Sequence, residues 1–568
     1  MVFPYDAFRP FQKEIFSQTY QALANRRPAV INAPTGLGKT AAVLSAAVKY
    51  MMETGVSIHY AVRTRNELGP PLRELLKIRE KVEIDYVVIK SRQDMCCYPQ
   101  LKKLDYLEFL AECALLKRQG SCRYYPPRDV DISVKNVYSY AHSLCEAGVC
   151  PYEYARQRLE QSQVVISTYF YLFSRERPRD RVVIIDEAHS VLDAVTSLYA
   201  IRLYEREVKA AYRECRKYGF LKEAVEIYRL LAFMRRHVGV VDMGDLLALL
   251  EGIQLDEAIW EITNRKAKEG RNPYTPLLAI RKLKDREKVR YFTEVREVDG
   301  VKALVMTPIE PLQIIKPVLE EAHNVVYLSG TLPISIYTEA LGLRSYDAID
   351  ISFRQYVPRE NYRSIVDMGV TTRFQERGEE MYVKIAERLA AVVNLSPRGV
   401  LAVFPSYEVL RGVKKYLKFT IPHWYEGVQE VDLGDLPQKF FLGAVAGGRY
   451  VEGVEYVRGG ENLLSVVAIV GVPYPEPTPY LEKRVESLKP RLRDRAWAAV
   501  YLYQAVVNVR QAVGRLFRSP QDRGLLAFLD RRYAEPELWN SLADILEGSL
   551  VVSHVDEAAG EIRQFLSL

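Results

Sequence analysis

The sequence has 568 residues, which at about 150 residues per domain predicts roughly two to four domains. Its 48% hydrophobic and 27% charged residues exclude a disordered chain, and no apolar run approaches the ~18 residues of a membrane span. The N-terminus has no basic stretch followed by an apolar one, so we expect no signal peptide and a cytoplasmic, intracellular protein. Lys and Arg outnumber Asp and Glu by 79 to 72, a net charge of +7 that suits a polyanionic partner.

In chain order, short apolar runs predict buried strands that alternate with helices. The strand candidates are 28–32, 58–62, 86–89, 181–186, 325–328, 400–404, 441–445 and 466–471, and the helix candidates of the same blocks are 40–52, 381–393 and 495–511. Strands that alternate with helices predict βα units and parallel sheets. We therefore expect an α/β protein with two blocks of this kind.

Between the two blocks the pattern changes. Residues 201–218, 221–237 and 243–253 repeat apolar side chains about every 3.6 positions, with charged residues on the opposite faces. This spacing predicts a mostly helical module. Its basic stretches at 265–268 and 281–290 indicate either a nucleic-acid surface or a solvated helix face.

The cysteines are unevenly spread. The chain has only 7, too few for a secreted protein held together by disulfides. Six of them lie within 55 residues: Cys96, Cys97, Cys113, Cys122, Cys145 and Cys150. This clustering indicates a metal or iron–sulfur site before disulfides, although the spacing alone leaves zinc open.

A phosphate-binding motif stands near the N-terminus. Residues 33–40 (APTGLGKT) follow a predicted strand and open a predicted helix, which is the context of a P-loop. Gly36 and Gly38 let backbone N–H groups approach a phosphate, and the helix N-terminus favours the anion. Lys39 would reach the β- and γ-phosphates, and Thr40 would bind Mg²⁺. The first position is alanine, where the strict pattern has glycine.

Two acidic residues end the predicted strand 181–186. Asp186 and Glu187 begin the sequence DEAH. A carboxylate at the tip of a strand beside a P-loop is placed to hold Mg²⁺, which we assign to Asp186. Glu187 would then orient the attacking water.

A third motif lies late in the chain. Gln511, Arg515 and Arg518 are spaced i, i+4 and i+7 on a predicted helix and therefore share one face. Arginines on one face can stabilise the charge on a transferring phosphoryl group. Alone, such a stripe is more often merely solvated, so its meaning depends on the two motifs upstream.

These three motifs, in this order on two α/β blocks, resemble the superfamily 2 helicases. The cysteines between the P-loop and DEAH, preceded by Ser91-Arg92 and ending in Cys150-Pro151-Tyr152, narrow the resemblance to the XPD family of iron–sulfur DNA helicases, and most to its archaeal members. Further matches are Gln12, 61–64, 328–332, 451–456 and 471–475. Glu455 stands where the family usually has aspartate.

The resemblance implies two RecA-like parallel-sheet motor domains, with an iron–sulfur module and a mostly helical arch inserted in the first. The implied boundaries are 1–90 with 160–200 and 300–345 for the first motor domain, 91–159 for the cysteine module, 201–299 for the arch and 346–568 for the second motor domain.

The resemblance also implies cofactors. A 4Fe–4S cluster would be held by Cys96, Cys113, Cys122 and Cys150. Cys97 and Cys145 stay uncertain, with a spare buried thiol as the commonest fate of such residues, and Cys215 is interpreted as packing. ATP and Mg²⁺ would bind between the motor domains.

In that site the resemblance implies that Gln12 reads adenine, that Gln511 helps to place the water, and that Arg515 and Arg518 reach across from the second motor domain. It further implies 5′→3′ movement of a monomer on single-stranded and forked DNA, in nucleotide excision repair or related DNA repair at the nucleoid. Two alternatives remain open. One is a DinG-like helicase that acts on R-loops or RNA–DNA hybrids. The other is a DNA-marking protein with an idle motor, against which the complete set of motor residues argues.

Overall fold

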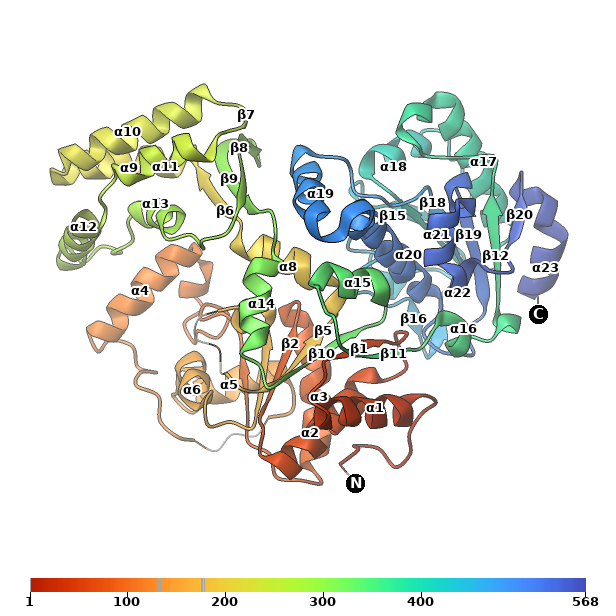
Figure 1. Cartoon of the computed structure of the whole chain (residues 1–568), viewed down its shortest axis with the longest axis horizontal. Coiled ribbons are helices and arrows are strands. Elements are labelled where there is room, and N and C mark those ends of the chain that lie inside the picture. Colours follow the sequence, from red (N-terminus) through yellow and green to blue (C-terminus); the bar gives the residue numbers. More distant parts are fainter. Residues whose placement is uncertain (1, 131–133, 175–176, 178, 568) are drawn as a thin grey trace. The chain divides into compact units, whose positions relative to one another are not determined.

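The structure is a computed structural model that describes residues 2–130, 134–174, 177 and 179–567 (Figure 1). The chain divides into two compact units. The first comprises Met1–Pro4, Ala47–Asp186 and Ser190–Val325, and the second comprises Tyr5–Ala46, Glu187–His189 and Val326–Leu568. No helix among the described residues is long and apolar enough to cross a membrane.

Four parallel strands form the centre of the first unit. They are β2 (Ile58–Val62), β3 (Tyr86–Ile89), β4 (Val164–Thr168) and β5 (Val182–Asp186), in the spatial order β5-β2-β4-β3. Their side chains are almost all buried, as expected for parallel strands that are covered on both faces. Because Ile58 pairs with both Val164 and Val182, the carboxyl ends of β2, β4 and β5 lie at one edge.

The cysteine module follows β3 and is largely irregular, with three short helices. These are α4 (Tyr106–Arg118), α5 (Val137–Glu146) and α6 (Pro151–Arg158). The side chain of Asp105 caps α4 by accepting from the N–H of Leu107 at 3.0 Å, and Asn136 caps α5 in the same way. The caps fix where these helices begin in a segment that has little periodicity.

The segment that begins at residue 201, which we call the arch, runs to Pro308 in the structure and contains a sheet as well as helices. In chain order its elements are β6 (Ile201–Tyr204), α9 (Glu205–Tyr218), α10 (Leu221–Arg236), β7 (Gly239–Val240), α11 (Met243–Glu251), α12 (Asp256–Lys268), α13 (Leu277–Lys284), β8 (Tyr291–Val298) and β9 (Val301–Pro308). The strands pair antiparallel in the order β6-β9-β8-β7. The prediction of one helix over 201–218 is wrong for its first four residues. Ile201 and Leu203 are buried while Arg202 is exposed, a strand alternation, and they pair with β9.

In the second unit, three parallel strands surround the start of the P-loop. They are β1 (Ala29–Asn32), β10 (Asn324–Ser329) and β11 (Asp347–Asp350), and β1 pairs in parallel with both of the others. The helices α1 (Gln12–Ala24) and α2 (Lys39–Thr54) flank β1 in the chain. Within this unit the three strands lie in the order β11-β1-β10.

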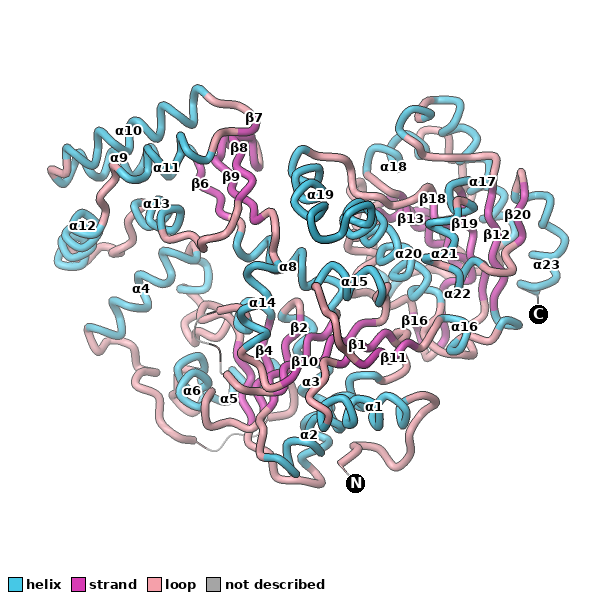
Figure 2. The backbone as a smooth tube through the Cα atoms, in the orientation of Figure 1, coloured by secondary structure: helices cyan, strands magenta, loops and turns pink. Residues whose placement is uncertain are grey.

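A seven-stranded sheet lies wholly in the second unit (Figure 2). Its strands are β12 (Tyr362–Asp367), β13 (Gly399–Phe404), β14 (His423–Tyr425), β15 (Phe441–Val445), β18 (Leu464–Val470), β19 (Gly524–Leu529) and β20 (Leu550–Val552), in the order β14-β15-β13-β18-β19-β12-β20 and parallel throughout. Apolar side chains of α17 (Glu379–Leu395), α18 (Tyr407–Lys414) and α23 (Ala559–Ser567) pack on it. Two parallel sheets with helical crossovers confirm the predicted α/β class with two RecA-like blocks.

The remaining helices connect these strands. Those of the first unit are α3 (Gly69–Arg79), α7 (Tyr169–Leu172), α8 (Val191–Tyr199) and α14 (Leu312–Glu320). Those of the second unit are α15 (Ile334–Leu341), α16 (Phe353–Tyr356), α19 (Pro479–Leu492), α20 (Tyr503–Leu516), α21 (Pro536–Ser541) and α22 (Ala543–Leu546). The short strands β16 (Val457–Arg458) and β17 (Glu461–Asn462) form a separate antiparallel pair.

Candidate nucleotide site and cysteine module

The P-loop connects β1 to α2, as the sequence predicts. Gly36 and Gly38 have φ angles of 88° and 84°, in the left-handed region that glycine adopts without strain. Lys39 opens the 16-residue helix α2 and is 8% exposed, and Thr40 follows it in the first turn. The free N–H groups at the start of α2 and the ammonium group of Lys39 together provide a site for a phosphate.

Gln12 is tied to the P-loop. It is 2% exposed, its Oε1 accepts the N–H of Arg9 at 2.8 Å, and its Nε2 donates to the carbonyl of Gly38 at 3.1 Å. A side chain fixed in this way stands in a defined position beside the phosphate site. The adenine-reading role of Gln12 stays a prediction.

Asp186 is the last residue of β5. The hydroxyl of Tyr60 donates to its Oδ2 at 2.7 Å, and the hydroxyl of Tyr169 donates to its backbone carbonyl. Two tyrosines of the first unit therefore orient this carboxylate, which the chain joins directly to Glu187.

Glu187 has a left-handed backbone, with φ of 52°, a conformation that costs energy in a residue other than glycine. Burial alone would raise the pKa of its carboxyl, but the charges of Lys39 and Arg515 and the contact with His189 outweigh it and lower the pKa to about 2. The carboxylate is therefore ionised at neutral pH. The charges of the P-loop lysine and of a late arginine therefore both act on Glu187.

His189 joins the motifs of the second unit in one network. Its Nδ1 is 3.3 Å from a carboxylate oxygen of Glu187 and 2.9 Å from Oγ of Ser329, and its Nε2 is 3.1 Å from Nε2 of Gln511. Thr331 also reaches Nδ1, at 3.2 Å. The segment 328–332 and the late helix α20 therefore both contact the DEAH segment.

Arg515 lies in the last turn of α20, which ends at Leu516, and Arg518 lies just beyond it. The prediction that Arg518 shares a helix face with Gln511 and Arg515 is therefore wrong, because the backbone turns extended at Phe517. Both guanidinium groups donate to the backbone carbonyl of Val454, Arg518 at 2.8 Å. Burial and the neighbouring charge of Arg518 lower the pKa of Arg515 to about 10, so it keeps its proton at neutral pH. The backbone carbonyl of Arg518 lies against Gly36, because a Cβ on that glycine would be only 1.9 Å from its oxygen. The structure thus brings the late arginine segment to the P-loop.

Sequence reasoning missed part of this site. The hydroxyl of Tyr356 donates to the carbonyl of Arg518 at 3.0 Å, and a pocket beside the P-loop is lined by Thr35, Tyr356 and Gly514, among others. The hydroxyl of Tyr503 donates to the carbonyl of His189 at 2.7 Å. Neither tyrosine stands in a recognisable motif, so no local signal in the sequence could have selected them among 38 tyrosines.

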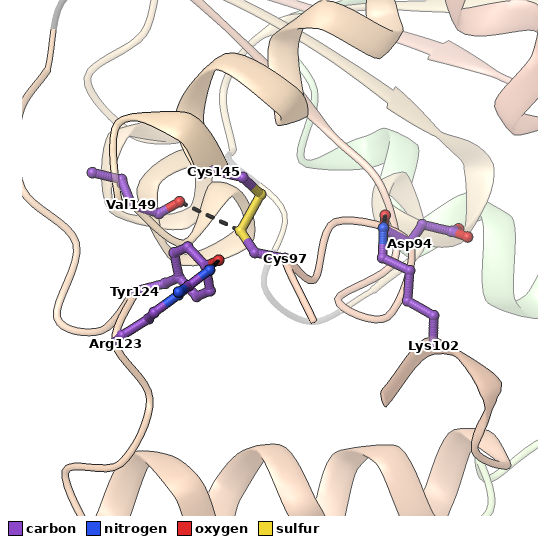
Figure 3. The surroundings of a disulfide bond; sticks show 7 residues. All are labelled: Asp94, Cys97, Lys102, Arg123, Tyr124, Cys145 and Val149. Carbon is purple, nitrogen blue, oxygen red and sulfur yellow. Dashed lines mark hydrogen bonds between the residues drawn. A yellow bond between two sulfur atoms is a disulfide. The ribbon is translucent and has the colours of Figure 1, made fainter. Parts of the chain in front are cut away.

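In the cysteine module, Cys97 and Cys145 form a disulfide, which the sequence interpretation did not predict (Figure 3). The sulfur of Cys97 lies 3.8 Å from the carbonyl of Val149, beside the disulfide. Forty-eight residues separate the two cysteines, so the bond links the loop after β3 to α5. Cys215 is a buried thiol in the arch, where it packs as predicted.

The four other cysteines of the module share one pocket. Cys96, Cys113, Cys122 and Cys150 are partly exposed thiols that line it together. Burial raises the pKa of Cys96 and of Cys113, and raises that of Cys150 to about 11, so these thiols are protonated at neutral pH and would release protons on binding a metal.

The module does not present a finished metal site. Within the described ranges, no three or more Cys, His, Asp or Glu side chains are arranged to hold a metal ion. The donor chemistry of four thiols in one pocket fits a thiolate-bound cluster.

A charged group borders the same pocket. The carboxylate of Glu153, 5% exposed, accepts from Arg92 at 2.5 Å and from Lys117 at 2.8 Å. Burial alone would raise the pKa of Glu153, but these two cations outweigh it and lower the pKa. The partner of Arg92 within the protein is thus a carboxylate from α6, a contact that the sequence did not predict.

Comparison with known proteins gives a consistent result. Residues 389–549 match the family model described as Helicase C-terminal domain, and residues 60–208 match the model described as DEAD_2. The chain is 25% identical to the ATP-dependent DNA helicase XPD of Sulfolobus acidocaldarius, over 92% of this chain and 96% of the relative. It is 24% identical to the ATP-dependent DNA helicase CHL1 of Kluyveromyces lactis, over 87% of this chain and 72% of the relative.

Solved structures share the fold. A structure titled XPD_Helicase superposes with a TM-score of 0.72 at 22% identity and covers 96% of this chain and 100% of its own. The structure of S. tokodaii Xpd4 superposes with a TM-score of 0.62 at 19% identity, again over 96% of this chain and 100% of its own. The resemblance predicted from the sequence motifs is therefore confirmed over nearly the whole chain.

Proposed function

We propose that this chain, which resembles the XPD helicases over more than nine-tenths of its length, is an ATP-dependent DNA helicase. The observation that carries the proposal is the convergence of the P-loop, the DEAH segment and the late arginine segment in one unit, with Gly36 against the backbone of Arg518 and Glu187 influenced by both Lys39 and Arg515. A site that needs groups from several parts of the chain hydrolyses ATP only when those parts are together, so hydrolysis can be coupled to movement along DNA.

Each side chain then has one role in hydrolysis. Lys39 and the start of α2 hold the phosphates, and Thr40 with Asp186 hold Mg²⁺. Ionised Glu187 orients and activates the water, with Gln511 helping through His189. Arg515 and Arg518, both protonated, stabilise the charge that builds on the transferring phosphoryl group. Gln12 selects adenine beside the P-loop.

We further propose that the cysteine module binds a 4Fe–4S cluster through Cys96, Cys113, Cys122 and Cys150. The presence of four thiols around one pocket supports the assignment. Bound there, the cluster would cross-link four separate segments of an irregular module.

The finer parts of the function are also proposals. The protein works as a monomer at the nucleoid, moves 5′→3′ on single-stranded and forked DNA, and serves nucleotide excision repair or related DNA repair. The resemblance to XPD helicases supports these assignments. Duplexes with a 5′ tail, a 3′ tail or an RNA strand test direction and substrate: only the 5′-tailed DNA duplex should be opened efficiently, and preference for the hybrid would favour an R-loop helicase.

The decisive experiment on the motor compares Lys39→Ala with Lys49→Ala. Both residues lie on α2, but Lys39 is 8% exposed at the P-loop, whereas the side chain of Lys49 is 41% exposed. We expect Lys39→Ala to abolish DNA-stimulated ATP hydrolysis and to keep single-strand affinity within about twofold, and Lys49→Ala to keep both. Hydrolysis at the parent rate by Lys39→Ala would refute the site.

A further inference from the structure

One face of α9 in the arch carries a continuous row of positive charge. The cations are Arg206, Lys209, Arg213, Arg216 and Lys217, all exposed, and we call them the α9 stripe. Their spacing of i, i+3, i+7, i+10 and i+11 puts them on one side of the helix. At 1.5 Å per residue the stripe is about 16 Å long.

The acidic residues of α9 do not neutralise the stripe. Glu205 pairs with Arg235 of α10 at 2.8 Å, and Glu214 pairs with the buried Lys266 of α12. Glu207 accepts the backbone N–H of Tyr204 at 2.8 Å. Among the described residues, none of the five cations forms an ion pair with a carboxylate. The stripe therefore presents five uncompensated charges.

Three of the five cations cover tyrosine rings instead. Arg206 lies 5.0 Å from the ring centre of Tyr204, and Arg216 lies 5.8 Å from that of Tyr212. Lys217 covers its neighbour Tyr218 in the same way, at 5.4 Å. A cation on a ring face keeps its full charge, and the covered face is not open for stacking a nucleobase. The stripe thus offers charge, and the tyrosine rings beneath three of its cations are covered on one face.

Three cations of the basic stretches that the sequence singled out already have carboxylate partners. Lys266 is 8% exposed and paired with Glu214, and Arg265 pairs with Glu261 at 3.3 Å. Arg281 lies 3.3 Å from the carboxylates of both Asp256 and Asp285. These cations are largely neutralised within the arch, whereas those of the α9 stripe are not.

We propose that the α9 stripe binds the phosphate backbone of duplex DNA. Duplex DNA carries one negative charge per about 1.7 Å of its axis, so a row of about 16 Å faces several phosphates at once. A duplex exposes its phosphates and hides its bases, which suits a surface where cations cover the neighbouring tyrosine rings. A single strand is usually bound by aromatic rings that are open for its bases to stack on. This contact goes beyond the motor, which needs only the strand that it moves along.

The test removes three charges from the stripe and compares the result with a matched control. The stripe variant is Lys209→Gln, Arg213→Gln and Arg216→Gln, and the control variant is Arg229→Gln, Arg265→Gln and Arg281→Gln. Both lower the net charge of the arch by three, but each control residue already pairs with a carboxylate. Full-length protein is titrated against a labelled blunt duplex of about 24 base pairs between 50 and 200 mM salt, with fluorescence anisotropy as the readout.

We expect the stripe variant to bind the duplex about 10- to 500-fold more weakly at 0.1 M salt, with a salt slope smaller by up to about 2.7, since each phosphate contact contributes about 0.9. The control variant should stay within about threefold of the parent. ATP hydrolysis stimulated by saturating oligo(dT) should be unchanged in both, which separates this proposal from a failure of the motor. The charge-preserving variant Lys209→Arg, Arg213→Lys and Arg216→Lys should bind the duplex like the parent.

Three results would overturn the proposal. Equal losses in the stripe and control variants would mean that only the overall charge of the arch matters. An unchanged salt slope in the stripe variant would mean that these cations do not contact phosphate. An equal or larger loss of affinity for oligo(dT) would mean that the stripe binds single strands rather than duplex.

Discussion

The substitution Gly36→Ala tests the approach of the P-loop to the late arginine segment. Gly36 has φ of 88°, and a Cβ on it would lie 1.9 Å from the carbonyl oxygen and 3.0 Å from the carbonyl carbon of Arg518. Both atoms belong to the backbone and cannot rotate away. Alanine therefore has to strain its own backbone and also push the two segments apart.

A matched control separates these two effects. Gly55, which directly follows α2, has φ of 77°, and a Cβ there would meet nothing within 4 Å. Left-handed alanine costs about 1–2 kcal/mol at either position. Only at Gly36 does the clash add to this cost, by about 1–3 kcal/mol if it resembles overpacking in a core. At 1.36 kcal/mol per tenfold change in rate, the extra cost corresponds to a rate about 5- to 150-fold lower.

The assay is DNA-stimulated ATP hydrolysis, with thermal unfolding as a check on stability. We expect Gly55→Ala to lose only the stability that left-handed alanine costs, and Gly36→Ala to hydrolyse ATP more slowly than Gly55→Ala by the additional factor. If Gly36→Ala hydrolysed ATP as fast as Gly55→Ala, the P-loop would not approach Arg518 in the hydrolysing state. The proposal that Arg515 and Arg518 stabilise the transition state would then be wrong.

Three other predictions follow from the same contacts. Cys122→Ser should lose iron and duplex unwinding but keep DNA-stimulated ATP hydrolysis, with iron followed by visible absorption and by iron and sulfide assays. The control Cys215→Ser, in the arch core, should keep about four irons per chain. Normal unwinding by Cys122→Ser would mean that unwinding does not need the cluster. Gln12→Ala, which removes the hydrogen bond to Gly38, should raise the KM for ATP and reduce the preference for ATP over GTP. If the ratio of kcat/KM for ATP to that for GTP did not change, Gln12 would not read adenine. Because its pKa is lowered from 4.5 to about 2, ionised Glu187 stabilises the fold above pH 4.5, and this stabilisation is lost as the pH falls towards 2. The difference in unfolding midpoint between the parent and Glu187→Gln should therefore shrink from pH 6 to pH 3, and a constant difference would contradict the assigned cause.

The central strands could be predicted from the sequence because their signal is local. The predicted strands 58–62, 86–89 and 441–445 have the bounds of β2, β3 and β15. A parallel strand covered on both faces needs a continuous apolar run, and that run is visible without knowledge of its neighbours. The glycines of the P-loop are local for the same reason, since the turn itself requires left-handed backbone at 36 and 38.

Other features depended on partners far away in the chain. The helical spacing of the residues after 204 predicts a helix that already begins at 201. Residues 201–204 form strand β6 instead because they pair with β9, about one hundred residues later in the chain. The disulfide between Cys97 and Cys145 depends on bringing two segments 48 residues apart to within 5.6 Å between Cα atoms. No spacing rule within either segment indicates that approach.

The sequence by itself determined which chemical groups the protein has and their order: a phosphate loop, an acidic strand end, an arginine helix and a cluster of thiols. These are set by short runs whose backbone or periodicity carries the signal. Only the tertiary structure decided which of these groups are neutralised and which are left to act. The charge of Lys266 is neutralised by Glu214, which stands 52 positions earlier in the chain. The charges of Lys209 and Arg213, on the same helix as Glu214, have no carboxylate partner among the described residues. The reason is that an ion pair forms through space, and the distance between two charges is set by the packing of the helices that carry them.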